Sequence, residues 1–195
     1  MKTHARVVVI GGGVVGASVL YHLTKAGWKD VVLVERKELT AGSTWHAAGG
    51  MHTLNGDPNV ARLQQYTVNL YKEIEKESGQ NCGIHLPGGI QLADTPERLD
   101  WLKMAHARGR YLGMKMEIIS VKEAKVLNPL LEEKYFVGAL YDEDEGSVDP
   151  YGVTHAYAIC AKNRGAEVYT NTWVTALNHR PDGTWDVITD KDHTI

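Results

Sequence analysis

The sequence of 195 residues predicts an α/β fold with an inserted region of mixed helices and strands. Three observations carry this prediction. A β-branched strand near the N-terminus enters a glycine-rich turn and a helix, and a second buried strand follows that helix. A further helix and strand are predicted near the C-terminus. We therefore assign residues 1–57 and 146–195 to one domain and residues 58–145 to the inserted region.

The N-terminal part predicts a strand–helix–strand unit. Arg6–Ile10 is a short β-branched strand, and a helical pattern runs from Val14 to about Ala26. Gly27 suits the position after the helix, where the backbone turns left-handed. Val31–Glu35 then forms the second strand of the unit, which favours a parallel sheet.

End signals predict three helices in the inserted region. Two begin with a capping residue followed by proline and end at a glycine, and the third begins with a capping box. These signals are Asp57, Pro58 and Gly79, then Thr95, Pro96 and Gly113, then Ser120 with Glu123. Strands are expected within His85–Ala93 and Phe136–Tyr141.

The C-terminal part predicts a helix, a strand and a hairpin. Asp149 and Pro150 open a helix that runs to about Arg164 and ends at Gly165. The elements that follow are a strand at Ala166–Thr170 and a hairpin of Trp173–Asn178 with Thr184–Thr189 around Arg180–Gly183.

Composition narrows the class of protein. The net charge of −3 gives no basic surface for nucleic acid or an anionic membrane, and the apolar runs are too short to span a bilayer. Cys82 and Cys160 lack any paired spacing, which favours free, packed thiols in a reducing compartment. We expect a cytoplasmic protein, or one of the mitochondrial matrix if the chain is a processed fragment of a eukaryotic homologue.

No histidine spacing typical of a metal site occurs, so we expect no metal. His52 and His85 lie near glycine-rich turns and are candidates for the substrate side, although a structural role is the better interpretation for both. The acidic run Asp142–Glu145 is expected to form a solvated loop, and Asp149 to cap a helix.

A dinucleotide-binding fingerprint follows the first strand. Gly11 allows the tight turn, Gly13 lets the backbone approach a diphosphate, and Gly16 lets the helix pack close to the strand. The helix N-terminus then binds the diphosphate. Glu35 lies 19 residues after Gly16, where a carboxylate accepts hydrogen bonds from ribose hydroxyls and disfavours NADP. The fingerprint predicts a Rossmann-like domain but does not separate FAD from NAD.

A second glycine-rich segment favours FAD. Seven of the nine residues from Gly42 to Gly50 are small, which suits a backbone packed against a flat ligand such as a flavin ring. A domain that binds only NAD needs no such segment. The segment reads Gly42, Ser43, Thr44, Trp45, His46, Ala47, Ala48, Gly49 and Gly50.

These residues resemble a known family. The strings Ile10–Gly16, Val34–Arg36 and Gly42–Gly49 are similar to dimethylglycine dehydrogenase and its sarcosine dehydrogenase relatives, within the D-amino-acid-oxidase-like flavoenzymes. The similarity continues through Gly146–Pro150 and Asp182–Val187, and so covers nearly the whole chain. It implies a FAD-binding domain of the glutathione-reductase type, with the insertion on the substrate side.

The resemblance also implies roles for single residues. His46 would carry the flavin through a bond to its 8α-methyl carbon; the alternative is a hydrogen-bonded histidine beside non-covalent FAD. A neutral imidazole is a competent nucleophile for such a bond. No catalytic residue or carboxylate clamp is assigned. With the fingerprint glycines, the predicted FAD-binding residues are Gly11, Gly13, Val14, Val15, Gly16, Glu35, Arg36, Gly42, Ser43, Thr44, Trp45, Ala47, Ala48, Gly49, Gly50 and Val174.

The implied reaction is oxidative N-demethylation of a small amino acid such as dimethylglycine or sarcosine, by hydride transfer to FAD. A protein electron acceptor is a further implied partner, and tetrahydrofolate would be one only with an additional C-terminal domain. Relatives continue past Ile195 with another parallel strand. We therefore expect an N-terminal part of a longer enzyme, with an exposed edge at Arg6–Ile10 and no turnover alone.

Three other functions remain open. An NAD-dependent dehydrogenase shares the first strand–helix–strand unit but does not use the Gly42–Gly50 segment. A related amine oxidase would pass electrons to oxygen. A non-catalytic regulatory homologue would use the same scaffold, and the presence of His46 weighs against it.

Overall fold

The computed structural model describes residues 1–195, which form two compact units. Unit 1 comprises Met1–Gly49, Tyr71–Gly83 and Asp149–Ile195, and unit 2 comprises Gly50–Leu70 and Ile84–Val148. The long helix α2 (Pro58–Ser78) therefore contributes residues to both units.

Unit 1 is built on a parallel sheet of three strands. These are β1 (Val7–Ile10), β2 (Val31–Val34) and β8 (Glu167–Tyr169), in the order β1-β2-β8. All four residues of β2 are buried, because a central strand covered on both faces has no solvent side. The exposed edge expected at the first strand is present, since β1 has a partner on one side only.

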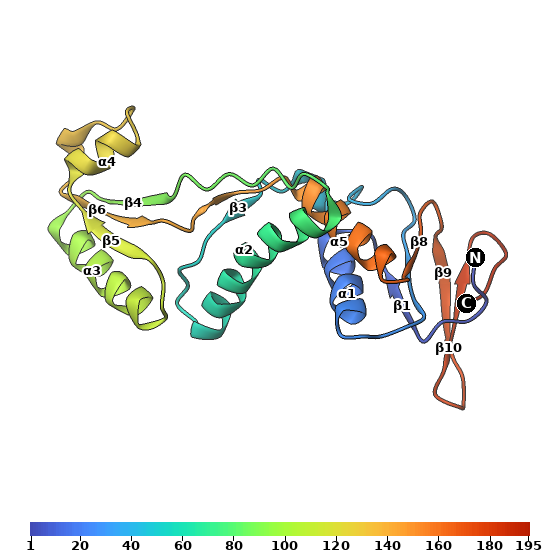
Figure 1. Ribbon diagram of the computed structural model, residues 1–195. Coiled ribbons are helices and arrows are strands. Elements are labelled where there is room, and N and C mark those ends of the chain that lie inside the picture. The colour runs from blue at the N-terminus through green and yellow to red at the C-terminus, as the bar shows by residue number, and fades with distance from the viewer. The chain divides into compact units, whose positions relative to one another are not determined.

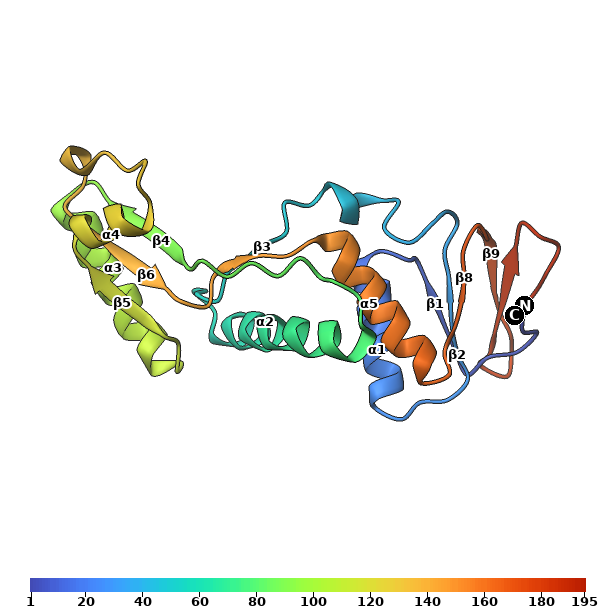
Figure 2. The same ribbon diagram turned by 45° about the horizontal axis from the view of Figure 1, so that its top comes forward.

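The two faces of this sheet carry different layers (Figures 1 and 2). Helices α1 (Val14–Lys25) and α5 (Pro150–Asn163) lie side by side on one face, where Leu20 and Leu33 share a buried cluster. The other face carries the hairpin of β9 (Val174–His179) and β10 (Trp185–Thr189). Strand residues alternate between the faces, so that Val32 and Val34 pack with Val187 of the hairpin.

Unit 2 contains an antiparallel sheet in the order β4-β6-β5. Helix α3 (Pro96–Tyr111) packs on it, with Leu102 and Leu140 in one buried cluster. Helix α4 (Val121–Leu127) lies near β6, where Ala124 and Ala139 form a second cluster. The strands are β4 (Gly89–Ala93), β5 (Met116–Ile119) and β6 (Gly138–Asp142), and two short strands β3 (Gly50–Met51) and β7 (Gly146–Ser147) pair with each other.

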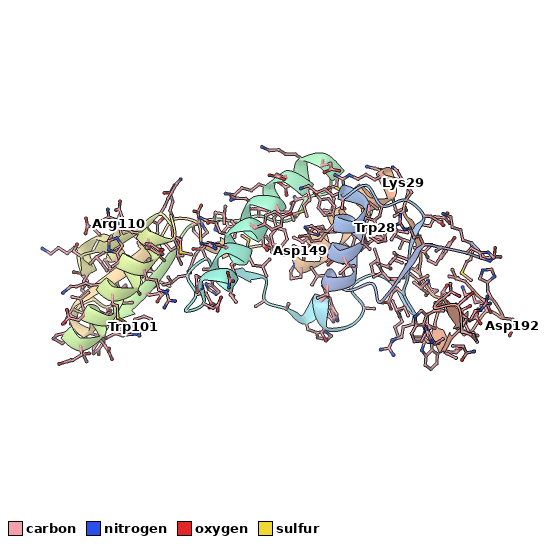
Figure 3. All side chains as sticks on the ribbon, turned by 90° about the horizontal axis from the view of Figure 1, so that it is seen from below. Trp28, Lys29, Trp101, Arg110, Asp149 and Asp192 are labelled. Carbon is pink, nitrogen blue, oxygen red and sulfur yellow. The ribbon has the colours of Figure 1, made fainter.

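The predicted helix ends are confirmed. The side chain of Thr95 accepts from the N–H of Arg98, and Ser120 and Glu123 form the capping box. Asp149, which is labelled in Figure 3, caps α5. Asp57 accepts from two N–H groups of the first turn of α2. The glycines predicted to end helices adopt positive φ, namely Gly27, Gly79, Gly113 and Gly165.

One prediction for unit 2 needs correction, and one strand was not predicted. Strand β5 was not predicted because it is only four residues long and is stabilised by pairing with β6. The acidic run is a solvated loop only in part: Glu143 and Asp144 form a turn in which Glu143 is exposed, whereas Asp142 and Glu145 are only 2% and 7% exposed. Asp142 is buried because it lies in the central strand, paired with Gly89 on one side and Met116 on the other.

None of the helices combines the length and the apolar character needed to cross a membrane.

Candidate cofactor-binding site

The glycine-rich turn after β1 brings the start of α1 close to the sheet. Gly11 has φ of +111°, a conformation that side chains disfavour, and it makes the turn out of the strand. A Cβ added at Gly16 would overlap the carbonyl oxygen of Gly11. The close approach of helix and strand therefore depends on glycine at this position, as the fingerprint predicts.

Glu35 lies beside this turn, directly after β2. One carboxylate oxygen accepts from the N–H of Gly12 at 2.6 Å and the other from the N–H of Lys37 at 2.8 Å. The Glu35 side chain is half-buried. Its carboxylate is therefore fixed next to the glycine turn, in the place expected for an acceptor of ribose hydroxyls.

Thr44 joins the second glycine-rich segment to the first. Its hydroxyl oxygen accepts from the N–H of Val14 at 3.0 Å, and so satisfies a donor at the start of α1. A Cβ on Gly13 would lie 2.9 Å from the same oxygen. The N–H of Thr40 donates to the carbonyl of Gly12 at 3.0 Å, with Thr40 itself at φ of +71°. Segments about thirty residues apart are thus held together at one helix end.

A groove of about 490 Å³ opens at this junction. It falls within the volume range of small-molecule sites. Predicted residues from both segments line it: Gly11, Gly13, Val14, Val15, Gly16, Glu35, Arg36, Gly42, Ser43 and Thr44. The helix N-terminus suits a diphosphate, and the glycines leave space where Cβ atoms would collide with neighbours, so the donor set fits a dinucleotide.

Five lining residues were not among the predicted ones: Val9, Ile10, Val19, Lys37 and Ala41. Lys37 and Ala41 lie within two residues of predicted positions, so their sequence neighbourhood could have identified them. Val19 lies one helical turn beyond Val15 on α1, and its role depends on which face of the helix the groove exposes.

His46 lies at the end of the 3-10 turn η1 (Ser43–His46). Its Nδ1 lies 3.1 Å from the carbonyl oxygen of Gly42, four residues earlier, and the ring is exposed. The indole of Trp45, itself 62% exposed, lies 4.6 Å from the imidazole between ring centroids. Because a carbonyl only accepts, this contact is a hydrogen bond only when Nδ1 carries the hydrogen, and in the neutral form of that tautomer Nε2 keeps its lone pair.

The remaining predicted residues lie outside the groove lining. Trp45, His46, Ala47, Ala48 and Gly49 continue the chain after Thr44, and Gly50 begins unit 2. Val174 packs with the cluster of Val32 and Val187 under the hairpin. The FAD contacts assigned to these positions stay predictions.

Two buried thiols in unit 1 are not nucleophile candidates. Burial raises the pKa of Cys82 to about 12 and that of Cys160 to about 11. Both cysteines are free and buried, as expected from the sequence. Thiols that stay protonated are poor nucleophiles, so the packing role holds for both.

Comparisons with known proteins agree with the geometry. The family described as “FAD dependent oxidoreductase” matches residues 6–195. Mitochondrial dimethylglycine dehydrogenase of Rattus norvegicus is 44% identical over 188 residues, which cover 96% of this chain and 22% of the relative. The mitochondrial pyruvate dehydrogenase phosphatase regulatory subunit of Mus musculus is 37% identical, over 98% of this chain and 22% of the relative. The chain thus spans about a fifth of the length of these relatives.

Among solved structures, L-proline dehydrogenase from P. horikoshii superposes with a TM-score of 0.90 at 27% identity. The match covers the whole of this chain and 51% of that one. Both units are therefore represented in a single neighbour of known structure.

Proposed function

This chain belongs to the family of FAD-dependent oxidoreductases, and on that premise we propose that it is the FAD-binding part of an amine dehydrogenase. The proposed reaction is oxidative N-demethylation of a small amino acid such as dimethylglycine or sarcosine. The observation that carries the proposal is the junction of the two glycine-rich segments, where Thr44 and Val14 meet at the head of the groove. The 44% identity to a dimethylglycine dehydrogenase supports the substrate class.

Residues of the groove would hold FAD along its length. We assign the adenosine ribose to Glu35 and the diphosphate to the N-terminus of α1, where N–H groups and the helix dipole favour negative charge. Arg36 also lines the groove and would add a positive charge near the diphosphate. The small residues from Gly42 onward would lie along the flavin end.

His46 is the proposed attachment point of the flavin. The bond to the Gly42 carbonyl supports this role, because it leaves Nε2 as the nucleophilic nitrogen. His46 would then hold the flavin through Nε2, in a bond to the 8α-methyl carbon of the ring. The contact with Trp45 limits the orientations open to the imidazole, which reduces the entropy lost on attachment.

When bound, FAD would accept the hydride that leaves the N-methyl carbon of the substrate. We propose that unit 1 is the FAD-binding domain, of Rossmann-like, glutathione-reductase type; the domain was predicted at residues 1–57 and 146–195, whereas unit 1 also includes Tyr71–Gly83 and excludes residues 50–57 and 146–148. Unit 2 is then the substrate-side region predicted at residues 58–145. Catalytic residues and the carboxylate clamp are not assigned to this chain. A protein electron acceptor and tetrahydrofolate are proposed only as partners of a longer enzyme.

Two other functions are compatible with the same groove. An amine oxidase would consume oxygen at the rate of substrate oxidation, whereas a dehydrogenase would need an artificial acceptor. The similarity to a phosphatase regulatory subunit favours a non-catalytic homologue as the second candidate. A protein that binds FAD but oxidises no amine, even as part of its longer chain, would support that candidate.

Acid precipitation tests the flavin proposal. The protein is purified, denatured in acid and separated, and the flavin spectrum is recorded for pellet and supernatant. Flavin that stays with the pellet in the natural protein, but not in His46→Ala, supports covalent attachment. Flavin in the supernatant supports binding and contradicts the bond. If no flavin co-purifies, titration with FAD decides, and an absence of binding contradicts the proposal.

A further inference from the structure

Two buried carboxylates flank the tight turn between β6 and β7. Asp142 ends β6 and Glu145 precedes β7, and their exposed fractions are 2% and 7%. The backbone N–H of Asp144 donates to Asp142 at 3.0 Å, which fixes the turn. Buried acids need partners, because an unpaired carboxylate in a low-dielectric site is strongly disfavoured.

The partners are two consecutive residues of one extended segment. The hydroxyl of Thr53 donates to Asp142 at 2.5 Å, and Nδ1 of His52 lies 3.3 Å from the Glu145 carboxylate. Both residues directly follow β3, which is only two residues long and pairs with β7. Side chains therefore supplement a very short backbone ladder in holding residues 50–54 to the turn.

The other charged groups near the turn do not replace His52. Glu143 points to Lys115 at 3.9 Å, and Asp144 adds a further negative charge. Gly88 and Gly89, at the start of β4, also lie here: the N–H of Gly88 donates to the Glu145 carbonyl at 3.1 Å, and a Cβ on Gly89 would overlap the Glu145 carboxylate. On the β7 side, His85 binds Ser147 through its backbone groups at 2.8 and 2.9 Å.

We propose that His52 and Glu145 form a pH-dependent latch that holds residues 50–54 on the β6–β7 turn while the imidazole is protonated. Thr53 and Asp142 form the second contact of the latch, which does not require a charged histidine. A neutral imidazole can still donate a hydrogen bond through Nδ1, but it no longer gives the buried Glu145 carboxylate a compensating charge, so the first contact weakens.

The electrostatics of the turn favour this behaviour. Burial raises the pKa of both Glu145 and Asp142. Repulsion by the Asp142 charge raises the pKa of Glu145 further. The His52 charge opposes both effects. Imidazole side chains as a class change charge between about pH 5 and 8, so the test compares a pH within this range with one above it.

Hydrogen exchange of the full chain tests the latch. Amide protection of residues 50–54 is measured at pH 6 and pH 8.5, with each value corrected for the intrinsic exchange rate. We expect protection to fall by about threefold to tenfold at the higher pH, as for an ion pair with one exposed partner. His52→Gln and Glu145→Gln should show the lower protection at both pH values.

Two control variants separate the latch from general effects. His179→Gln, whose ring lies 4.7 Å from Trp185 in unit 1, should keep the pH dependence of the natural protein. Thr53→Val should lower protection equally at both pH values. Protection in the natural protein that is independent of pH, or a pH dependence that survives in His52→Gln, would overturn the proposal. The measurement on the natural protein holds even if a variant does not fold.

Discussion

The hydroxyl of Thr44 accepts a hydrogen bond of 3.0 Å from the N–H of Val14, the first residue of α1. The residue before the helix is Gly13, which has no side chain to cap it. A residue of the second glycine-rich segment therefore performs the capping that a helix normally receives from its own N-terminus. This contact sets the distance between the two segments that line the groove.

Thr44→Val should weaken both the fold and the groove. Loss of a capping acceptor lowers stability by about 1 kcal/mol, and the apolar side chain leaves the Val14 N–H unsatisfied. FAD affinity, measured by quenching of flavin fluorescence, should fall as well. Thr175→Val is the control, since its hydroxyl bonds only to the Ile188 carbonyl in the hairpin and should leave FAD affinity unchanged.

Gly16→Ala and Gly42→Ala should have opposite outcomes. A methyl group at Gly16 overlaps the Gly11 carbonyl, so we expect a loss of about 2–3 kcal/mol in the free energy of unfolding. Gly42 has open space around its Cβ position and a negative φ, so alanine should be tolerated there. Urea denaturation of the two variants checks the contrast, and equal stability would contradict the packing argument.

The two thiols should resist modification in the folded protein. With pKa values of about 12 and 11 caused mainly by burial, Cys82 and Cys160 are almost wholly protonated at pH 8. A chromogenic disulfide reagent should react slowly with the native chain and rapidly with both thiols in denaturant. Fast reaction of one thiol in the native state would show that its region opens.

Ionisation of Asp142 should make the stability of the protein depend on pH. Burial raises the pKa of this carboxyl above its ordinary value of 3.8, so the folded state binds its proton more tightly than the unfolded state. The stabilising contribution is complete below about pH 4 and is lost as the pH rises through the raised pKa. Asp142→Asn, which cannot ionise, should match the natural protein at pH 4 and exceed its stability at pH 8. Thermal unfolding at the two pH values measures the difference, and a lower stability of the variant at pH 8 would contradict it.

Features that depend on neighbouring residues could be predicted from the amino-acid sequence. Helix ends at Asp57, Thr95, Ser120 and Asp149 follow from side chains that bond to backbone groups two or three positions away. The positive φ of Gly11, which makes the turn out of β1, likewise follows from the glycine itself. Such interactions are local, so a single segment contains all the information that specifies them.

Features that depend on distant partners could not be predicted in this way and became visible only in the folded chain. Asp142 and Glu145 belong to an acidic run typical of a loop, yet both are buried because β4 and β5 flank the strand that leads into the turn. Strand β5 itself forms through that pairing, and Thr44 reaches Val14 only once β2 has returned the chain to the glycine turn. Burial and capping across such distances are properties of packed elements, which the pattern of one segment does not contain.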